Sequence, residues 1–286
     1  AEIDIMEANL YTFHSTLHTQ FDHDGFGRGF GGGDGFDGPR DWDADQFAPN
    51  SACIDTLRAF QTAVSFPADG EGMLVAMELM ISQEGRDCKL YVRLSEYNGM
   101  AVLSRVLRDG VTPVISYWAS DKMLWLDGEG EDGKGHCKTD EPEKCPAETK
   151  LYDFSVQDSV MDFPERFRNR HSKAKAHKQA HASPAAKPVK EECPGDIDFA
   201  GYGKVSLVPT GWAGSDSSAS AVEVLPNSTV VPYLGSRAYF ADSCTAGTYD
   251  RSQYLKLNLL GHKMRYRVDL SGAGCGCNAA LYLVSM

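Results

Sequence analysis

Short runs in which apolar and polar residues alternate recur along most of the chain. Clusters of Gly, Pro, Asn and Asp separate them, which is the pattern of β-strands joined by turns. The runs predicted as strands are residues 2–8, 13–19, 56–66, 73–82, 88–94, 112–118, 151–156, 203–208, 254–260, 264–270 and 279–285. One helix is predicted over 98–108, where Met100, Leu103, Val106 and Leu107 follow helical spacing. Many strands with almost no helix predict an all-β fold, a sandwich of two antiparallel sheets.

Residues 164–192 depart from this pattern. The segment reads PERFRNRHSKAKAHKQAHASPAAKPVKEE and has almost no apolar side chain that could pack in a core. We interpret it as a flexible basic linker. The alternatives are an arm that binds nucleic acid or another polyanion, and a metal site. The metal site would use His171, His177 and His181, whose geometry nothing in the sequence fixes.

The net charge of the chain limits the classes of partner that it can bind. The 286 residues carry a net charge of −12; the linker contributes eight Lys and Arg against three Glu, or +5, so the rest carries −17. A body this acidic repels nucleic acid. No apolar run approaches the roughly 20 residues needed to cross a bilayer. We therefore expect no nucleic-acid partner and no membrane partner. We also expect a monomer.

The cysteines indicate the compartment. Eight of them are scattered along the chain without a CxxC pair, at Cys53, Cys88, Cys137, Cys145, Cys193, Cys244, Cys275 and Cys277. This usage favours disulfides and an oxidising compartment over a zinc ribbon. The glycan acceptor sequence at 227–229 agrees with a secreted, extracellular protein. Since no signal-like apolar region opens the chain, we expect any secretion signal to lie outside it.

Three acids stand close together at the start of the chain, in the segment AEIDIMEAN. In a regular strand Glu2 and Asp4 point to one face and Glu7 to the other. One β-bulge would return Glu7 to the face of Glu2 and Asp4, with Ile3 and Ile5 in the core. The Cα atoms of Glu2 and Glu7 would then be roughly 13–16 Å apart, and two inclined side chains could bring their carboxyls much closer.

Crowded carboxyls suit acid–base chemistry. They cannot all ionise comfortably, so one should keep its proton near neutral pH. Hydrolysis of a glycosidic bond with retention needs one carboxylate as nucleophile and one protonated carboxyl as acid, about 5–5.5 Å apart. The alternatives from spacing alone are a solvated acidic strand edge and a calcium site. Zinc held by His14 and His18 would need a third ligand that the sequence does not indicate, so we expect no metal and no cofactor.

The segment EIDIMEAN resembles the ExDxxE signature of the glycoside hydrolase clan that contains families 7 and 16. Both are β-jelly-roll enzymes that cut β-glucans with retention. Residues 12–19, TFHSTLHT, resemble family 16. Three further segments resemble family 7, the fungal-type cellulases: DWDADQ at 41–46, TPVISYWASDKMLWLDG at 112–128 and YLKLNLLGHKMRYRVDLSGAGCGCNAALYLVSM at 254–286.

The resemblance implies roles for the acidic segment. Glu2 would be the nucleophile and Glu7 the acid/base, while Asp4 would hydrogen-bond Glu2 and tune its protonation. His18, eleven residues after Glu7, would be an active-site histidine near the leaving group. We expect His14 to bind a structural partner instead.

The resemblance also implies substrate contacts. Trp118 and Trp125 would stack on sugar rings, and Asn278 and Tyr282 would line the glycone side. Asp41 would belong to the product-side loop. For the tryptophans, packing in the core is the alternative.

Departures from family 7 refine the expected activity. The family usually has an Arg where Gln46 stands, and several tunnel-forming loops have no counterpart. We infer an open cleft and cutting within chains. The hypothesis is therefore a retaining, endo-acting β-1,4-glucan hydrolase. The alternatives are a β-1,3- or mixed-linkage glucanase and a non-catalytic glucan-binding wall protein on the same scaffold.

The order of the segments is reversed relative to the family. Residues 193–286 resemble its N-terminal half, and residues 1–163 its C-terminal half with the catalytic strand. The chain could be a circular permutant or a fragment across the junction of two tandem copies. If the halves complete one domain, the resemblance implies a disulfide between Cys137 and Cys275.

Overall fold

The computed structural model describes residues 1–22, 29–32, 38–130, 132–158, 160, 163–164, 192–212 and 220–286. The chain is nearly all-β, with 43% of residues in strands and 9% in helices. Two large antiparallel sheets form a β-sandwich of the jelly-roll type, so the predicted fold class is confirmed. Almost the entire linker lies outside the described residues.

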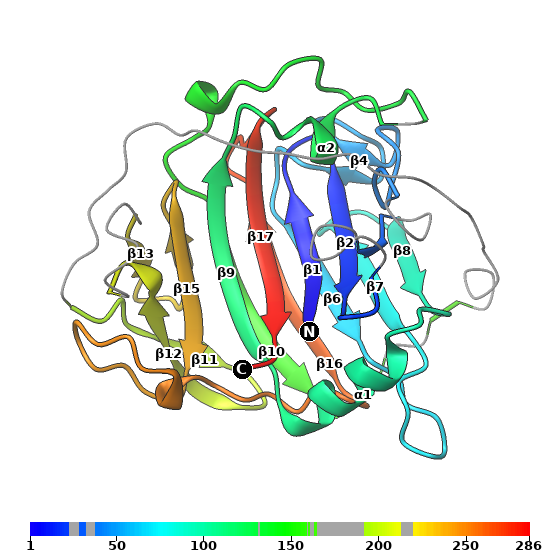
Figure 1. Ribbon diagram of the computed structural model, residues 1–286. Coiled ribbons are helices and arrows are strands. Elements are labelled where there is room, and N and C mark those ends of the chain that lie inside the picture. The colour runs from blue at the N-terminus through cyan, green and yellow to red at the C-terminus, as the bar shows by residue number, and fades with distance from the viewer. Residues whose placement is uncertain are drawn as a thin grey trace.

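An eight-stranded sheet forms the front of the molecule in Figure 1. Its strands lie in the order β11 (Asp196–Phe199), β12 (Gly203–Pro209), β15 (Ser236–Ala241), β9 (Thr112–Ala119), β17 (Cys277–Val284), β1 (Glu2–Ala8), β2 (Phe13–His18) and β3 (Phe30–Gly31). The first and last strands of the chain are therefore neighbours, and Figure 1 shows both termini at the same end of this pair.

A seven-stranded sheet packs behind it, with β10, β16, β6 and β7 visible in Figure 1. The order is β13 (Val222–Val224), β14 (Val230–Pro232), β10 (Lys150–Gln157), β16 (Lys263–Asp269), β6 (Phe60–Ser65), β7 (Met77–Ser82) and β8 (Lys89–Leu94). The other elements are a parallel pair, β4 (Phe47–Ala48) and β5 (Ile54–Asp55), the helices α1 (Met100–Asp109) and α2 (Leu124–Asp127), and 3-10 turns at Pro142–Lys144, Thr210–Trp212 and Arg251–Gln253.

The hydrophobic core fills the space between the two sheets. The alternation along β1 buries Ile3 and Ile5 completely in this core, as predicted. Burying such side chains stabilises the fold by about 1.5–3 kcal/mol each. This burial fixes the orientation of β1 and turns its acidic residues to the outer face of the front sheet.

Residues 1–163 and 193–286 both contribute strands to each sheet. The first part supplies β1, β2, β3 and β9 to the front sheet, and the second supplies β11, β12, β15 and β17. Two disulfides join the parts, Cys137–Cys275 and Cys145–Cys277. Two others lie within one part each, Cys53–Cys88 and Cys193–Cys244. The family resemblance implied the Cys137–Cys275 pair.

Most predicted strands are present, but the one expected over 254–260 is wrong. Leu255, Leu257 and Leu259 are buried alternately, as in a strand. Their backbone amides, however, bond to three different places, the carbonyls of Phe240, Val111 and Leu107. No single neighbouring strand pairs with the segment, so alternation here reflects packing alone. Conversely, β15 was not predicted, although it is an interior strand of the front sheet. Within the part of the chain that the structure describes, no helix is long and apolar enough to span a membrane.

Candidate active site

A local irregularity in β1 brings the three acids to one face. Against β17 the register shifts between Asp4 and Met6, and against β2 it shifts between Asp4 and Glu7. Such a shift is what a β-bulge produces, and a bulge is the irregularity that would return Glu7 to the face of Glu2 and Asp4. Because directly paired residues in antiparallel strands point to the same side, Glu2, Asp4 and Glu7 face outward with the residues opposite them on β2, which include His18 and His14.

The carboxyls change one another's ionisation. Burial raises the pKa of Glu7 from 4.5 to about 8, and the charge of Asp4 adds to the shift. Burial also raises the pKa of Glu2, as do the charge of Asp4 and a hydrogen bond between the two carboxyls. A carboxyl that loses its proton only near pH 8 can act as a general acid at neutral pH.

His18 links Asp4 to a second acid. Its Nε2 lies 3.0 Å from Asp4 Oδ2 and its Nδ1 lies 3.2 Å from Asp22 Oδ2. Burial alone would lower the pKa of His18, but the hydrogen bonds to Asp22 and Asp4 outweigh it and raise the pKa to about 10. His18 is therefore an imidazolium at neutral pH, and it places a positive charge beside the acidic strand.

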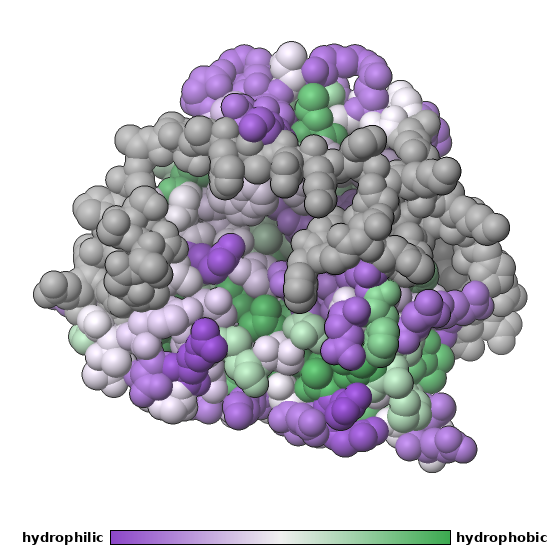
Figure 2. Space-filling view, in the orientation of Figure 1, coloured by the Kyte–Doolittle hydropathy of each residue, from purple (hydrophilic) through white to green (hydrophobic). Residues whose placement is uncertain are grey.

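The neighbouring strands add amide and aromatic groups to the same face. Asn278 on β17 donates from Nδ2 to Glu7 Oε1 at 2.8 Å, and Tyr282 pairs directly with Asp4. On β9, Trp118 pairs directly with Asn278 and is half-buried. Asn278 and Tyr282 therefore lie beside the acids, and Trp118 lies one strand further away, on β9. Figure 2, in the orientation of Figure 1, shows hydrophilic and hydrophobic side chains mixed on this face.

Trp125 lies at the end of the site near His14. Their ring centroids are 6.3 Å apart in an edge-on arrangement, and Trp125 is 39% exposed on α2. His14 itself bonds to structural partners, with Nε2 2.6 Å from the Gly38 carbonyl and Nδ1 3.0 Å from Thr16 Oγ1. That prediction is confirmed. Burial lowers the pKa of His14, so the His14 ring stays neutral at neutral pH, whereas His18 is charged.

The loop after β1 holds α2 in place. Asn9 Nδ2 donates to Asp127 Oδ2 at 2.6 Å, and Thr12 Oγ1 donates to the Leu126 carbonyl at 3.0 Å. Asp127 Oδ2 also accepts from the Gly276 amide at 3.0 Å. The acidic strand and the turn that carries Trp125 are therefore one connected unit. Sequence reasoning missed Asn9 and Asp127, although Asn9 stands in the same EAN segment as Glu7.

Asp41 lies on the far side of β2 from the acids. Its backbone amide donates to the Phe13 carbonyl at 2.9 Å, which sets it beside the first residue of that strand. The preceding Arg40 is buried and donates to the carbonyls of Gly128 and Glu129, both at 3.2 Å. Asp41 is thus near the Trp125 end, separated from β1 by β2.

Several residues of the site carry no sequence signal of their own. Asp22 and Arg237 come from a turn and from the unpredicted strand β15, yet Asp22 bonds to His18 and the charge of Arg237 lowers the pKa of Glu2. Gly29 has a steric role, because a Cβ there would collide with Thr16 and lie 2.5 Å from His18 Cε1. Only tertiary contact identifies these residues.

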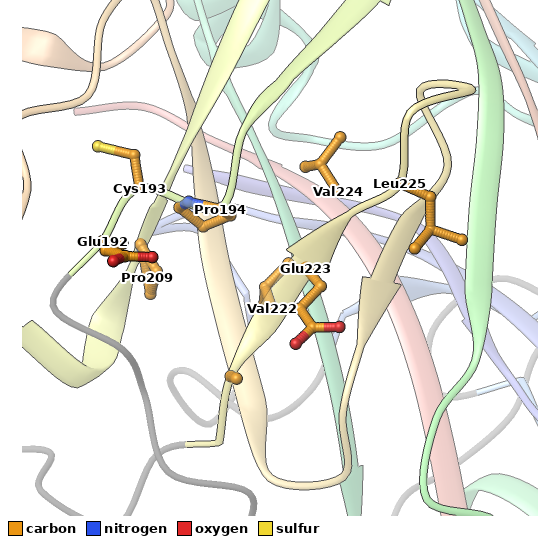
Figure 3. Close-up of a pocket in the computed structure, with 9 residues that line it drawn as sticks. Glu192, Cys193, Pro194, Pro209, Val222, Glu223, Val224 and Leu225 are labelled. Atoms are coloured by element: carbon orange, nitrogen blue, oxygen red, sulfur yellow. The ribbon is translucent and has the colours of Figure 1, made fainter.

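A separate pocket lies at the other end of the sheets (Figure 3). It is lined by Glu192, Cys193, Pro194, Pro209, Ala221, Val222, Glu223, Val224 and Leu225. Residues 192–194 precede β11, Pro209 ends β12, and residues 221–225 form β13 and its flanks. In the front sheet, β12 is four strands from β1. The pocket is therefore distinct from the acidic site. No family model matches the chain, and no solved structure matches it.

Proposed function

We propose that the chain is a retaining, endo-acting hydrolase of β-1,4-glucan, similar to glycoside hydrolase family 7. The observation that carries the proposal is the acidic face of β1, where Glu7 keeps its proton to about pH 8 within reach of the charge of Asp4 and Glu2. A strand that served only as a solvated edge would not bury a protonated carboxyl at this cost. A calcium site would require carboxylates that are ionised and free of a neighbouring imidazolium.

In the proposed reaction Glu7 donates its proton to the glycosidic oxygen while the Glu2 carboxylate attacks the anomeric carbon. The bond from that carbon to the leaving sugar breaks, and a covalent glycosyl ester of Glu2 forms. Glu7, now a carboxylate, takes a proton from a water molecule, which attacks the same carbon and releases Glu2. The two displacements retain the configuration. Asp4 orients Glu2 through the hydrogen bond between their carboxyls.

This assignment sets the pH range of activity. The reaction needs Glu2 ionised and Glu7 protonated at the same time. The lower limit follows the pKa of Glu2, which lies above its ordinary value, and the upper limit follows the pKa of Glu7, about 8. We expect a bell-shaped profile of kcat/KM whose alkaline limb falls near pH 8.

The substrate contacts follow from the neighbouring strands. Indole and phenol rings pack against the C–H faces of sugars. Tyr282 beside the acids, Trp118 one strand away on β9 and Trp125 at the leaving-group end would make these contacts. Asn278 orients Glu7 and borders the glycone side. Asp41 contributes to the product side from beyond β2. The four disulfides agree with an oxidising compartment, and secretion is part of the proposal.

The test is hydrolysis of an activated aryl β-cellobioside. Glu2→Gln and Glu7→Gln should each nearly abolish this hydrolysis, while the far-UV circular dichroism spectrum and the unfolding transition stay native-like. Glu71→Gln, at an exposed turn, is the matched control and should keep full activity. Azide should restore turnover to Glu2→Ala and give a product of inverted configuration. Near-normal activity in either glutamine variant would refute the assignment.

The substrate class is tested on oligosaccharides. Cello-oligosaccharides should be cut faster than laminari-oligosaccharides, with internal bonds cut first. The reverse preference would indicate a β-1,3- or mixed-linkage glucanase. Binding of glucan without any cleavage would indicate a carbohydrate-binding protein on the same scaffold.

A further inference from the structure

A chain of hydrogen bonds runs from Asp4 away from the acidic face into the protein. His18 bridges Asp4 and Asp22, at 3.0 and 3.2 Å. On the far side of Asp22, its Oδ1 accepts from the Tyr97 hydroxyl, and its Oδ2 accepts from the Thr19 amide at 3.2 Å. The Tyr97 hydroxyl also lies 2.7 Å from Thr19 Oγ1. Every polar atom of the Asp22 carboxyl is therefore held by a named partner.

We propose that Asp22 and Tyr97 are positioning residues of the acidic site, which act through His18 to keep a fixed positive charge against Asp4. The inference rests on the proposed function for its catalytic consequence. Its structural part, the charge and orientation of His18, stands on the contacts alone and can be measured without any substrate.

The contacts of the two ring nitrogens define the charge of His18. Each nitrogen faces a carboxylate oxygen, and a carboxylate can only accept, so both nitrogens must carry a proton. Apart from His14, the titratable groups around the ring are all acids: Glu2, Asp4 and Glu7 come from β1, and Asp22 comes from the turn after β2. The neighbouring imidazole, His14, adds no charge at neutral pH because burial lowers its pKa.

The end of this hydrogen-bond network formed by Asp22 and Tyr97 is buried. The Asp22 side chain is 2% exposed and Tyr97 is 3% exposed, so water cannot replace either contact. Tyr97 precedes α1 and stacks on Phe30 with ring centroids 5.4 Å apart. Gly99 lets this turn pass, because a Cβ there would collide with the Tyr97 ring. Burial, with the hydrogen bond to Asp22, raises the pKa of Tyr97, so its hydroxyl remains a donor.

The arrangement has a consequence for the acids of β1. The positive charge of His18 lowers the pKa of both Glu2 and Glu7, against the effects of burial and of Asp4. Without that charge both carboxyls would hold their protons to higher pH. Asp22 thus influences the proposed nucleophile and acid without touching substrate.

Asp22→Asn is the direct test, because asparagine has nearly the same shape. Its amide oxygen can accept from His18 and Thr19, and its amide nitrogen can donate to the Tyr97 hydroxyl once that hydroxyl donates to Thr19. Nitrogen NMR of labelled imidazole rings should show His18 doubly protonated from pH 6 to 9 in the native chain, in keeping with a pKa of about 10. In Asp22→Asn the ring should lose its second proton inside that pH range, because its pKa should fall by about one unit or more.

Two further readouts separate charge from geometry. Carbon NMR of labelled glutamate carboxyls should show that the titration midpoint of Glu7 lies at higher pH in Asp22→Asn than in the native protein. In the same variant, kcat should fall about tenfold or more with KM little changed. Tyr97→Phe leaves both carboxylates at His18, so the ring should stay doubly protonated while kcat falls less. The matched control is another tyrosine–aspartate pair, Tyr202 with Asp242 at 2.9 Å; Tyr202→Phe should change none of these quantities.

The possible results are separable from those of the hydrolysis test. A His18 ring that titrates near pH 7 in the native chain, or one whose titration is unchanged by Asp22→Asn, would overturn the inference. An unmoved Glu7 midpoint with a shifted His18 would overturn the coupling to the acids. If the native chain cuts no glucan, the proposed function fails, and the two titrations still decide whether Asp22 and Tyr97 position the acidic site.

Discussion

Replacing Glu7 by glutamine should stabilise the protein at pH 8 while it removes the proposed activity. The folded state raises the pKa of Glu7 from 4.5 to about 8. Between these values the native protein holds a proton that the unfolded chain has lost. Stability therefore falls as the pH rises through this window. The proton's contribution is complete below pH 4.5 and gone above about pH 8.

The magnitude follows from the width of the window. Each pH unit in which the native state holds one extra proton changes the free energy of unfolding by about 1.4 kcal/mol. The full shift would give an upper bound of about 5 kcal/mol. The carboxyl of Glu7 is buried, but the residue as a whole keeps partial contact with solvent, and its protonation is coupled to that of Asp4 and Glu2. The expected range is therefore about 2–5 kcal/mol. Glutamine abolishes this loss, because it is neutral and its Oε1 can still accept from Asn278.

Urea unfolding of the disulfide-intact protein between pH 4 and 9 is the assay. At pH 4 the native chain and Glu7→Gln should have similar free energies of unfolding, and the advantage of glutamine should grow up to pH 8 and then level off. Glu71→Gln, at the exposed turn, should follow the native curve. A difference that does not grow with pH, or a glutamine variant that is less stable at pH 8, would refute the buried, protonated state of Glu7.

Three further outcomes are expected. Trp125→Ala should reduce kcat/KM for long cello-oligosaccharides by about tenfold and leave kcat/KM for short aryl glycosides nearly unchanged. Leu124→Ala, on the same exposed turn, should change neither value, and equal losses on both substrates in Trp125→Ala would indicate a packing role for the indole. Gly29→Ala should lower kcat and shift the His18 NMR resonances, because the new methyl group would occupy the space of that ring. Gly70→Ala, whose new methyl group would meet no atom within 4 Å, should change neither quantity, and a fully active Gly29→Ala would contradict the close packing of Gly29 against His18. Proteolysis within the linker should leave the two parts joined on a non-reducing gel and associated after gentle reduction, since they share both sheets; separation without reductant would exclude the two connecting disulfides.

Sequence reasoning worked where the chemistry is local. The alternation of Ile3 and Ile5 with the acids predicted both the strand and the face that it buries. The odd spacing of Glu7 meant that a bulge would be needed to turn it to the face of Glu2 and Asp4. Helical spacing predicted α1 within two residues of its observed bounds. These features depend on neighbours within one strand or one helix, so a short segment contains all the information that determines them.

Reasoning from alternation failed where the backbone partners are distant. Leu255, Leu257 and Leu259 alternate as in a strand, but whether a segment joins a sheet depends on what lies beside it. The strand β15 gives the opposite case, since its six residues carry a weak pattern and its place is fixed by pairing with β12 and β9.

The acidic strand by itself could have been catalytic, metal-binding or merely solvated. The sequence determined that Glu2 and Asp4 would share one outward face, because side chains alternate along a strand. Glu7 joins that face through the register shift of β1 against β17 and β2. Only the tertiary structure decided the ionisation of the three carboxyls. It did so by packing β17 against β1, which supplies Asn278, and by closing the turn that sets Asp22 against His18. A pKa depends on burial and on charges brought close in space, and these contacts join segments that are far apart along the chain.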